Sequence, residues 1–333
     1  MQNLGYRTNS ILANRNEILV TNKDSNGITL LRLRYPKLES ETIKLFNGLK
    51  SACLARFQDL HLISIDNTLC ASRDLMEWKT VLSLKPGNFI WHICETQKEL
   101  IAQEYGEPPT FLYSSQNGLE WEKILDNNQV DRTSKHWHSV AYDKNQDHVY
   151  ATLGDGNITK VITLKNNFSW KPLYTGPWQF VPIVVLDDKA VFGMDSNLVH
   201  GGMGIYRRDA GWEFTFLRWN DENIKRGQVC DLKLLSNGIW VAALGSPSAV
   251  LVSKDLRRWV VAEISEINHD FNHFMNIGEG DGFLAVSTSK GLILFEKDEI
   301  SNLALKEPFV APYKAYKERL MGPLNMTKRR AGL

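Results

Sequence analysis

Three side chains capable of acid–base chemistry stand where apolar runs of this 333-residue chain begin or end. His138 begins the run 138–142, Asp155 follows the run 148–153 in the segment TLGDG, and Asp195 follows the run 190–194 in the segment FGMDS. Imidazole and carboxyl groups commonly transfer protons in enzymes, and loops on a rigid scaffold commonly present them. We therefore predict His138, Asp155 and Asp195 as catalytic residues.

Further polar and aromatic residues at similar boundaries suit a sugar ligand. Aromatic rings stack on the C–H faces of sugars, amide and imidazole groups bond to hydroxyls, and arginine binds a carboxylate. A sugar or a uronic acid is the predicted ligand. The predicted substrate-binding residues are Arg7, Tyr105, His136, Trp178, Gln179, Arg226 and His273.

Each candidate also has a purely structural interpretation. Asp155 and Asp195 either contact a ligand or cap tight turns through their own carboxylates. His138 is either a ligand contact or a core histidine bonded to a carbonyl group. The histidines at 136, 138 and 273 have no spacing typical of a metal site, so we predict neither a metal nor another cofactor.

The elements that position these residues recur along the chain. Ser72, Asp74, Leu75 and Trp78 match the pattern at 253–259, and a version with glycine runs through Ser114, Gln116, Gly118 and Trp121. Weaker copies end at residues 170 and 212. A repeat of about 42–49 residues is typical of solenoids or propeller blades. Each copy lies between two apolar runs, which indicates a hairpin turn closed by a tryptophan.

Seven units of four short runs account for residues 1–306, with 303–305 as the last run of the seventh unit. We predict an all-β, seven-bladed β-propeller of four-stranded antiparallel blades with these hairpins on its rim. Loops that precede the first strand of a blade and loops between its second and third strands open on the same face. His138, Asp155, Gln179 and Asp195, from adjacent units, should therefore line one pocket at the channel mouth.

A separate extension is predicted for residues 307–333. Pro308 and Pro312 indicate an extended exit from the ring, and Tyr313–Met321 could form two turns of helix before Gly322. The basic run 328–330 is interpreted as a solvated terminus.

The repeated hairpins resemble the Asp-box, Ser-x-Asp-x-Gly-x-x-Trp, of sialidase-like β-propellers. The segment 136–209, from HWHSVAYDKNQDHVYATLGDG through FGMDS to GIYRRD, is also similar to uncharacterised bacterial and archaeal members of that group. The resemblance implies a carbohydrate-active propeller. It does not imply a true sialidase, because Leu33-Arg34-Tyr35-Pro36 ends a third strand and does not open a first strand as the sialidase arginine motif does.

Two functions from different classes follow from this resemblance. The first is a glycan lyase or glycoside hydrolase acting on an acidic oligosaccharide or polysaccharide in the central funnel. In a lyase, His138 or Tyr105 would act as base and Arg226 would neutralise the uronate. The second is a propeller without catalytic activity that binds glycans or serves as a scaffold for protein complexes.

Composition limits the remaining classes. The 39 basic and 38 acidic residues give a net charge of +1, which does not favour binding to nucleic acid or to a membrane surface. The first 17 residues lack the basic start and apolar core of a signal peptide, and no apolar run approaches the length of a membrane span. We expect a cytoplasmic protein. A protein partner is compatible with this composition.

Overall fold

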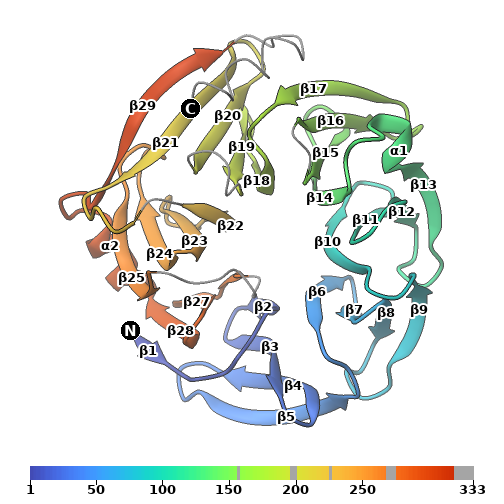
Figure 1. The fold of residues 1–333 in the computed structure, drawn as a ribbon. Coiled ribbons are helices and arrows are strands. Elements are labelled where there is room, and N and C mark those ends of the chain that lie inside the picture. Colours follow the sequence, from blue (N-terminus) through green and yellow to red (C-terminus); the bar gives the residue numbers. More distant parts are fainter. Residues whose placement is uncertain (156–157, 196–200, 225–226, 268–274, 319–333) are drawn as a thin grey trace.

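Seven antiparallel sheets, six of four strands and one with an added fifth strand, form a closed ring around a central channel (Figure 1). The computed structural model describes residues 1–155, 158–195, 201–224, 227–267 and 275–318, with the backbone alone described for 310–318. The predicted seven-bladed β-propeller is confirmed. No helix among these residues is long and apolar enough to cross a membrane.

Each blade runs from an inner strand beside the channel to an outer strand at the rim. The inner strands are β2 (Ile11–Asn14), β6 (Ser51–Phe57), β10 (Phe89–Glu95), β14 (His136–Asp143), β18 (Phe180–Val185), β22 (Gln228–Leu234) and β26 (Ile277–Glu279). The second strands are β3 (Glu17–Asp24), β7 (Leu60–Ile65), β11 (Leu100–Tyr105), β15 (His148–Gly154), β19 (Lys189–Met194), β23 (Trp240–Ser246) and β27 (Phe283–Thr288). The third strands are β4 (Gly27–Arg34), β8 (Thr68–Ser72), β12 (Phe111–Ser115), β16 (Thr159–Lys165), β20 (Gly202–Arg207), β24 (Ser248–Ser253) and β28 (Gly291–Glu296). The outer strands are β5 (Glu39–Phe46), β9 (Lys79–Ser83), β13 (Glu122–Asp126), β17 (Trp170–Gly176), β21 (Gly211–Trp219), β25 (Val260–Glu266) and, in blade seven, β1 (Gln2–Asn3).

Apolar packing between adjacent blades forms the core. Seven buried clusters occur, one for each pair of neighbouring blades. Strand β15 shows the principle: Val149, Ala151 and Leu153 pack toward blade three, whereas Tyr150 packs toward Phe192 of blade five. Because both faces of each sheet are covered, the strands have nearly continuous apolar sequences.

The N-terminal strand β1 closes the ring. Gln2 pairs with Leu294 and Asn3 with Ile293, so β1 supplies the outer strand of blade seven. The prediction that 303–305 forms this strand is wrong, because helix α2 (Lys297–Leu303) follows β28 directly. Ile300 of α2 is fully buried in the cluster between blades six and seven, so the segment is stabilised as a helix by its apolar face.

The extension forms a fifth strand on blade five, and the prediction of a helix over 313–321 is wrong for its described part. Strand β29 (Val310–Glu318) pairs antiparallel with β21 (Figure 1). The outer strand β21 offers a row of unpaired backbone groups, and the sequence of β29 is rich in valine and tyrosine, which favour strands. Residues 319–333 lie outside the described part of the chain.

The repeated hairpins connect the third and outer strands, as predicted. In the turn at 253–259, the Oγ of Ser253 accepts a hydrogen bond from the N–H of Leu256, at 3.0 Å. Asp255 Oδ1 accepts from the N–H groups of Arg257 and Arg258, at 2.9 and 2.8 Å. The turn at 72–78 has the same bonds. These polar residues therefore hold the turn together.

The residues predicted for the hairpin turn of blade three are wrong by one position. In blade three the turn uses Ser115 and Asn117, in place of the predicted Ser114 and Gln116. This alignment gives the same spacing as the other copies and places Gly118, at φ 72°, where the other turns have leucine at φ 67° and 63°. Asparagine replaces aspartate because its side-chain oxygen accepts the same two N–H bonds.

Replacing Asp255 with alanine should destabilise the hairpin by roughly 0.5–2 kcal/mol, by analogy with the loss of a helix cap. Two N–H groups would lose their acceptor, although water can replace part of the loss at this partly exposed position. Urea unfolding measures the change. The exposed Asp209→Ala serves as control and should change the free energy of unfolding by less than about 0.5 kcal/mol. Equal effects of the two substitutions would contradict the assigned role.

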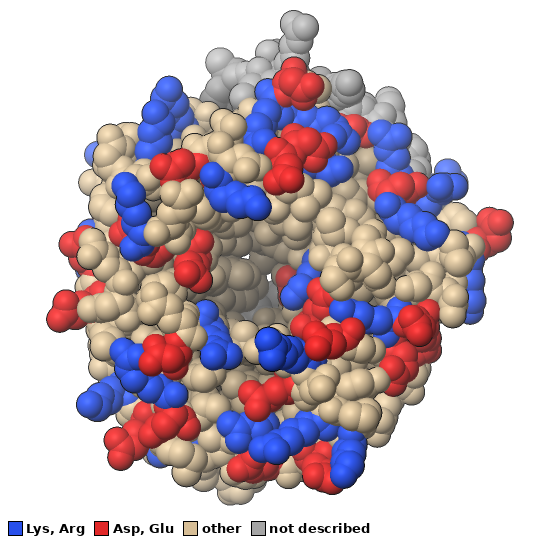
Figure 2. Space-filling model, turned by 180° about the vertical axis from the view of Figure 1, so that it is seen from behind, with Lys and Arg blue, Asp and Glu red and all other residues tan. Residues whose placement is uncertain are grey.

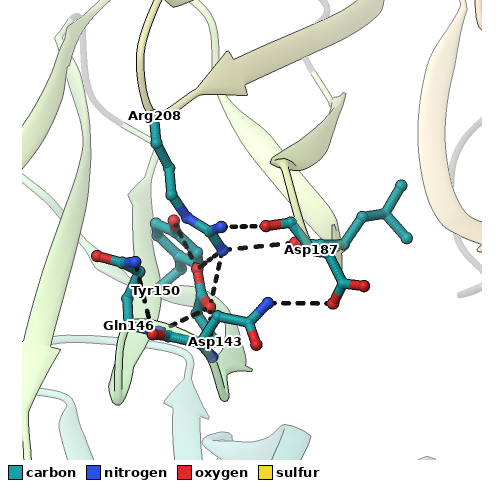
Figure 3. Close-up of polar contacts among 7 residues, drawn as sticks. Asp143, Gln146, Tyr150, Asp187 and Arg208 are labelled. Atoms are coloured by element: carbon teal, nitrogen blue, oxygen red, sulfur yellow. Dashed lines mark hydrogen bonds and ion pairs between the residues drawn. The ribbon is translucent and has the colours of Figure 1, made fainter.

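A buried ion pair connects blades four and five. Asp143, at the end of β14, is fully buried and accepts hydrogen bonds from Arg208, which follows β20 (Figure 3). The hydroxyl of Tyr150 and the N–H of Gln146 also donate to this carboxylate. Burial acts to raise the pKa of Asp143, but Arg208 and the backbone donors hold it below its usual value. The pair therefore stabilises the fold at neutral pH and weakens as the pH falls through that pKa.

Replacing Arg208 with alanine should lower the free energy of unfolding by roughly 2–4 kcal/mol, because Asp143 would remain buried without its charged partner. Arg207→Ala is the matched control. Arg207 forms an exposed pair with Asp188, at 3.0 Å, and its loss should cost less than about 1 kcal/mol. Urea unfolding of the two variants tests the difference, and similar losses would show that the Asp143 pair does not stabilise this blade contact.

Candidate functional site

The first two strands of blade four bring His136, His138 and Asp155 together. His136 lies opposite Gly154 in the register between β14 and β15, and Asp155 follows directly. The register shifts between Trp137 and Ser139, and Trp137 packs in the core between blades three and four. This irregularity lets both histidines lie on the side of the strand away from Trp137, next to the carboxylate of Asp155.

Gly154 makes room for His138. A Cβ atom at position 154 would lie 2.0 Å from Cε1 of His138, so any larger residue would displace the imidazole. The His138 Nε2 lies 3.7 Å from Oδ1 of Asp155, and the His136 Nε2 lies 3.3 Å from Oδ2. The two imidazole side chains are 5% and 2% exposed for His136 and His138, and the Asp155 side chain is 34% exposed.

The backbone contacts of His136 determine its protonation. Its Nδ1 lies 2.6 Å from the carbonyl oxygen of Gly106, so Nδ1 carries a proton and donates it. In the neutral imidazole, Nε2 then carries no proton, and its lone pair faces Asp155. Neither this Nε2 nor either ring nitrogen of His138 forms a hydrogen bond with any described residue. The ring of Tyr105 lies against His136, with centroids 3.8 Å apart.

Two buried side chains of blade three support the strand irregularity. The carbonyl oxygen of His138 accepts hydrogen bonds from Nδ1 of His92, at 2.9 Å, and from Nε2 of Gln103, at 2.8 Å. Burial lowers the pKa of His92 to about 4, so that ring is neutral. Burial, then the proximity of His136, lowers the pKa of His138 to about 3, despite the opposing charge of Asp155. Both rings therefore act as uncharged groups near neutral pH.

Asp155 is held as a carboxylate. The largest influence on its pKa is a hydrogen bond that a positively charged His136 ring would donate, and it holds this pKa well below the usual range although burial opposes it. The N–H of Asp155 donates to Oε1 of Gln179, at 2.9 Å, and Nε2 of Gln179 donates to Oδ1 at 3.3 Å. Gln179 thus connects blade five to the site, and Asp155 remains ionised at neutral pH.

Asp195 has the opposite ionisation behaviour. Its carboxyl group is 7% exposed and accepts a hydrogen bond from Gln228 Nε2 at 3.1 Å. Burial, then the charge of Asp155, raises the pKa of Asp195 to about 7. Burial also raises the pKa of Tyr105, and both carboxyl groups add to that rise. Tyr105, Asp155 and Asp195 are therefore close enough to share one electrostatic environment.

A residue of blade two shows how a carboxylate at this position can hold the backbone of the loop that enters its own blade. Asp66 follows β7 as Asp155 follows β15, with φ 47° and 59°, respectively. Its Oδ1 accepts from the N–H groups of Leu49 and Lys50, at 3.1 and 2.9 Å. Within the described residues, the Asp155 and Asp195 carboxylates instead contact side chains of other loops. Residues 156–157 and 196–200, the rest of both turns, lie outside that part.

The other predicted residues are distributed differently. Trp178 packs in the core against Phe214, with ring centroids 4.2 Å apart, and so is not a surface for stacking a sugar. Arg7 lines a separate depression with Lys23 of blade one and Thr288 of blade seven. Arg226 and His273 lie outside the described residues. The predictions for these four residues as ligand contacts therefore gain no support from the histidine cluster.

Two participants were not predicted from the sequence. Gln103 is completely buried within the apolar strand β11. A polar amide within an apolar run was the feature of the sequence that could have indicated this role. Gln228 begins β22, so its position at the start of a strand was the available signal. Its role depends on β18 and β22 being neighbours in the ring, which the spacing alone does not specify.

Buried apolar side chains from non-adjacent blades pack together near the centre of the ring. An eighth cluster joins Ala52, Phe89, Trp91 and Val181 from the inner strands of blades two, three and five. Figure 2, from the side opposite to that of Figure 1, shows a hollow at the centre of the ring. Lysine and arginine alternate with aspartate and glutamate over this face, so neither sign of charge dominates it.

The sequence matches no protein-family model and no curated protein. Solved structures with similar folds include virginiamycin B lyase from Staphylococcus aureus, with 11% identity, a TM-score of 0.66, and coverage of 88% of this chain and 97% of that one. A puromycin hydrolase mutant complexed with PGG has 10% identity, a TM-score of 0.61, and coverage of 94% and 54%.

The extracellular domain of a putative hybrid two component system from B. thetaiotaomicron has 11% identity and a TM-score of 0.64, with coverage of 88% of this chain and 38% of that one. The chain thus spans well under two thirds of this domain and of the puromycin hydrolase. At these identities the likeness shows the fold alone, and membership of the sialidase-like group stays a prediction.

Replacing Asp195 with asparagine should change how stability depends on pH. In the folded protein the pKa of Asp195 is about 7, above the ordinary value of 3.8. The folded state therefore binds this proton more tightly than the unfolded state does, and protonation of Asp195 stabilises the fold. Its contribution therefore decreases as the pH rises from about 4 to 7. The asparagine variant should gain stability relative to the unaltered protein between pH 5 and pH 8, as measured by urea unfolding. Parallel profiles would contradict a raised pKa.

Proposed function

We propose that the protein is a carbohydrate-active propeller, a glycan lyase or glycoside hydrolase, whose site contains Tyr105, Asp155 and Asp195. The observation that carries this proposal is the opposite ionisation of two carboxyl groups from adjacent blades. Asp155 is ionised and Asp195 titrates near pH 7. Carboxyl groups whose environments separate their pKa values are typical of acid–base catalysis on glycosidic bonds.

In a hydrolase of this design, Asp195 donates a proton to the leaving oxygen, Asp155 stabilises the positive charge that develops on the sugar ring, and a water molecule attacks the anomeric carbon and returns a proton to Asp195. The low pKa of His138 makes it a weak base, so we assign it a positioning role beside Asp155 in place of general base catalysis. We assign the phenol group of Tyr105 and the amide of Gln179 to sugar hydroxyls. The proposed preference for an acidic glycan requires positive charge close to the site. Lys135 supplies part of this charge, since it acts on Asp155.

The test is a glycan array followed by product analysis with the oligosaccharides that bind. Unsaturated products would identify a lyase, and reducing ends without unsaturation a hydrolase. Asp195→Asn should reduce turnover by about 10²–10⁴-fold, the usual contribution of a general acid. Asp66→Asn is the matched control, because Asp66 occupies the equivalent position in blade two but bonds only the backbone N–H groups of the loop before β6, and this variant should keep full activity.

Absence of binding to acidic and neutral glycans would favour the alternative, a scaffold or binding propeller without catalytic activity. Full turnover by the Asp195→Asn protein would also contradict the assigned acid. The exposed large apolar residues in the described part of the chain include Leu49, Met76, Leu119 and Leu305, which come from turns of different blades. They do not by themselves support a protein-binding surface.

A further inference from the structure

Three electron-rich atoms converge at the start of blade four. They are Nε2 of His136, Nε2 of His138 and a carboxylate oxygen of Asp155, and all three lie within 4.8 Å of one another. His136 and His138 are 4% and 1% exposed, and neither Nε2 forms a hydrogen bond with any described residue. Buried polar atoms without a partner are rare in folded proteins and indicate a missing binding partner.

The protonation of His136 makes a simple hydrogen bond to Asp155 a poor explanation. Its Nδ1 already donates to the carbonyl oxygen of Gly106, so the neutral ring presents only a lone pair to the carboxylate. A lone pair and a carboxylate 3.3 Å apart repel each other unless a positive charge lies between them. A proton or a cation would supply that charge, and the second imidazole favours the cation because it adds another lone-pair donor.

We propose that His136, His138 and Asp155 bind one divalent transition-metal ion, of which Zn²⁺ is the representative. Two imidazole nitrogens and one carboxylate oxygen suit zinc and related ions, whereas Ca²⁺ and Mg²⁺ prefer oxygen ligands throughout. Three protein ligands also leave coordination positions for water or a substrate. The proposal assigns a binding site, and its test does not depend on the glycan substrate.

The separations between ligand atoms are close to those a bound ion would need. For metal–ligand distances of about 2.1 Å, neighbouring ligand atoms lie about 3.0–3.4 Å apart. The observed distances from Asp155 to the two imidazoles are 3.3 and 3.7 Å. Small rotations of the partly exposed Asp155 side chain would shorten these two distances, whereas the separation of the two imidazole nitrogens, within 4.8 Å, is set by the rotation of the rings themselves.

The surroundings resemble those of metal-binding histidines. A ligating imidazole usually donates its other N–H to a carbonyl or carboxylate, and the bond from His136 to Gly106 does this. The ring of Tyr105 covers the face of His136, and Gly154 leaves the space that His138 occupies. The backbone of His138 is in turn fixed by His92 and Gln103. The imidazoles are thus held in place before an ion binds.

The experiment is equilibrium metal binding to the full chain without a histidine tag. After treatment with a chelator, the protein is incubated with Zn²⁺, Mn²⁺, Mg²⁺ or Ca²⁺, dialysed and measured by elemental analysis and calorimetry. One Zn²⁺ ion per chain is expected, with X-ray absorption showing two imidazole ligands. His136→Gln and Asp155→Asn should weaken affinity at least tenfold. Asparagine also suits the positive φ of residue 155, which keeps that variant foldable.

His61→Gln and Asp66→Asn are the matched controls, since both residues belong to blade two and should leave affinity unchanged. No stoichiometric ion in the unaltered protein, or equal affinity in the Asp155→Asn variant, would overturn the proposal. An X-ray absorption spectrum without two imidazole ligands would also overturn the proposal. This measurement uses the unaltered protein and does not depend on the folding of a variant. Metal binding without glycan turnover would uphold this inference and remove only the proposed function.

Discussion

The burial of two imidazoles against a single carboxylate is the constraint around which the centre of this propeller is arranged. It requires the strand irregularity at Trp137, the absence of a side chain at Gly154 and the two side-chain bonds to the His138 carbonyl oxygen. An unpaired buried polar group costs about 1–3 kcal/mol, and apolar packing between blades offsets that cost. Stability alone gives no reason to keep such an arrangement, which is why it marks a site.

The fold was predictable because the ring repeats one unit. Tryptophans spaced at one blade length and continuous apolar runs reflect sheets that are covered on both faces. Apart from the shifted turn of blade three, the errors in the fold occurred where the repeat ends. Blade seven takes its outer strand from residues 2–3, almost the full chain length away, and local sequence does not reveal such a pairing. The helix predicted over 313–321 failed because the edge of β21, a tertiary feature, selects the extended form.

The contacts of the candidate residues were harder to predict than the neighbourhood of their loops. Equivalent positions in adjacent units predicted that Asp155 and Asp195 lie near each other, and the charge of Asp155 does act on Asp195. Sequence alone does not distinguish Asp66, which bonds the backbone of the loop before β6, from Asp155, which faces two imidazoles. Similarly, Trp178 and Gln179 are consecutive, yet one packs in the core and the other reaches Asp155. Such differences depend on side-chain direction at strand ends.

The pairing of β1 with β28 also governs how this protein can be made. Strand β1 has no partner in the nascent chain until residues 291–296 have been synthesised, about 15–60 s later at 5–20 residues per second. During that interval, completed blades can pack on one another, but the ring stays open and presents unpaired strand edges. Because the final contact joins sequence-distant segments, closure is a slow, late step of folding. Nascent chains of this protein should therefore depend on protection from aggregation during synthesis.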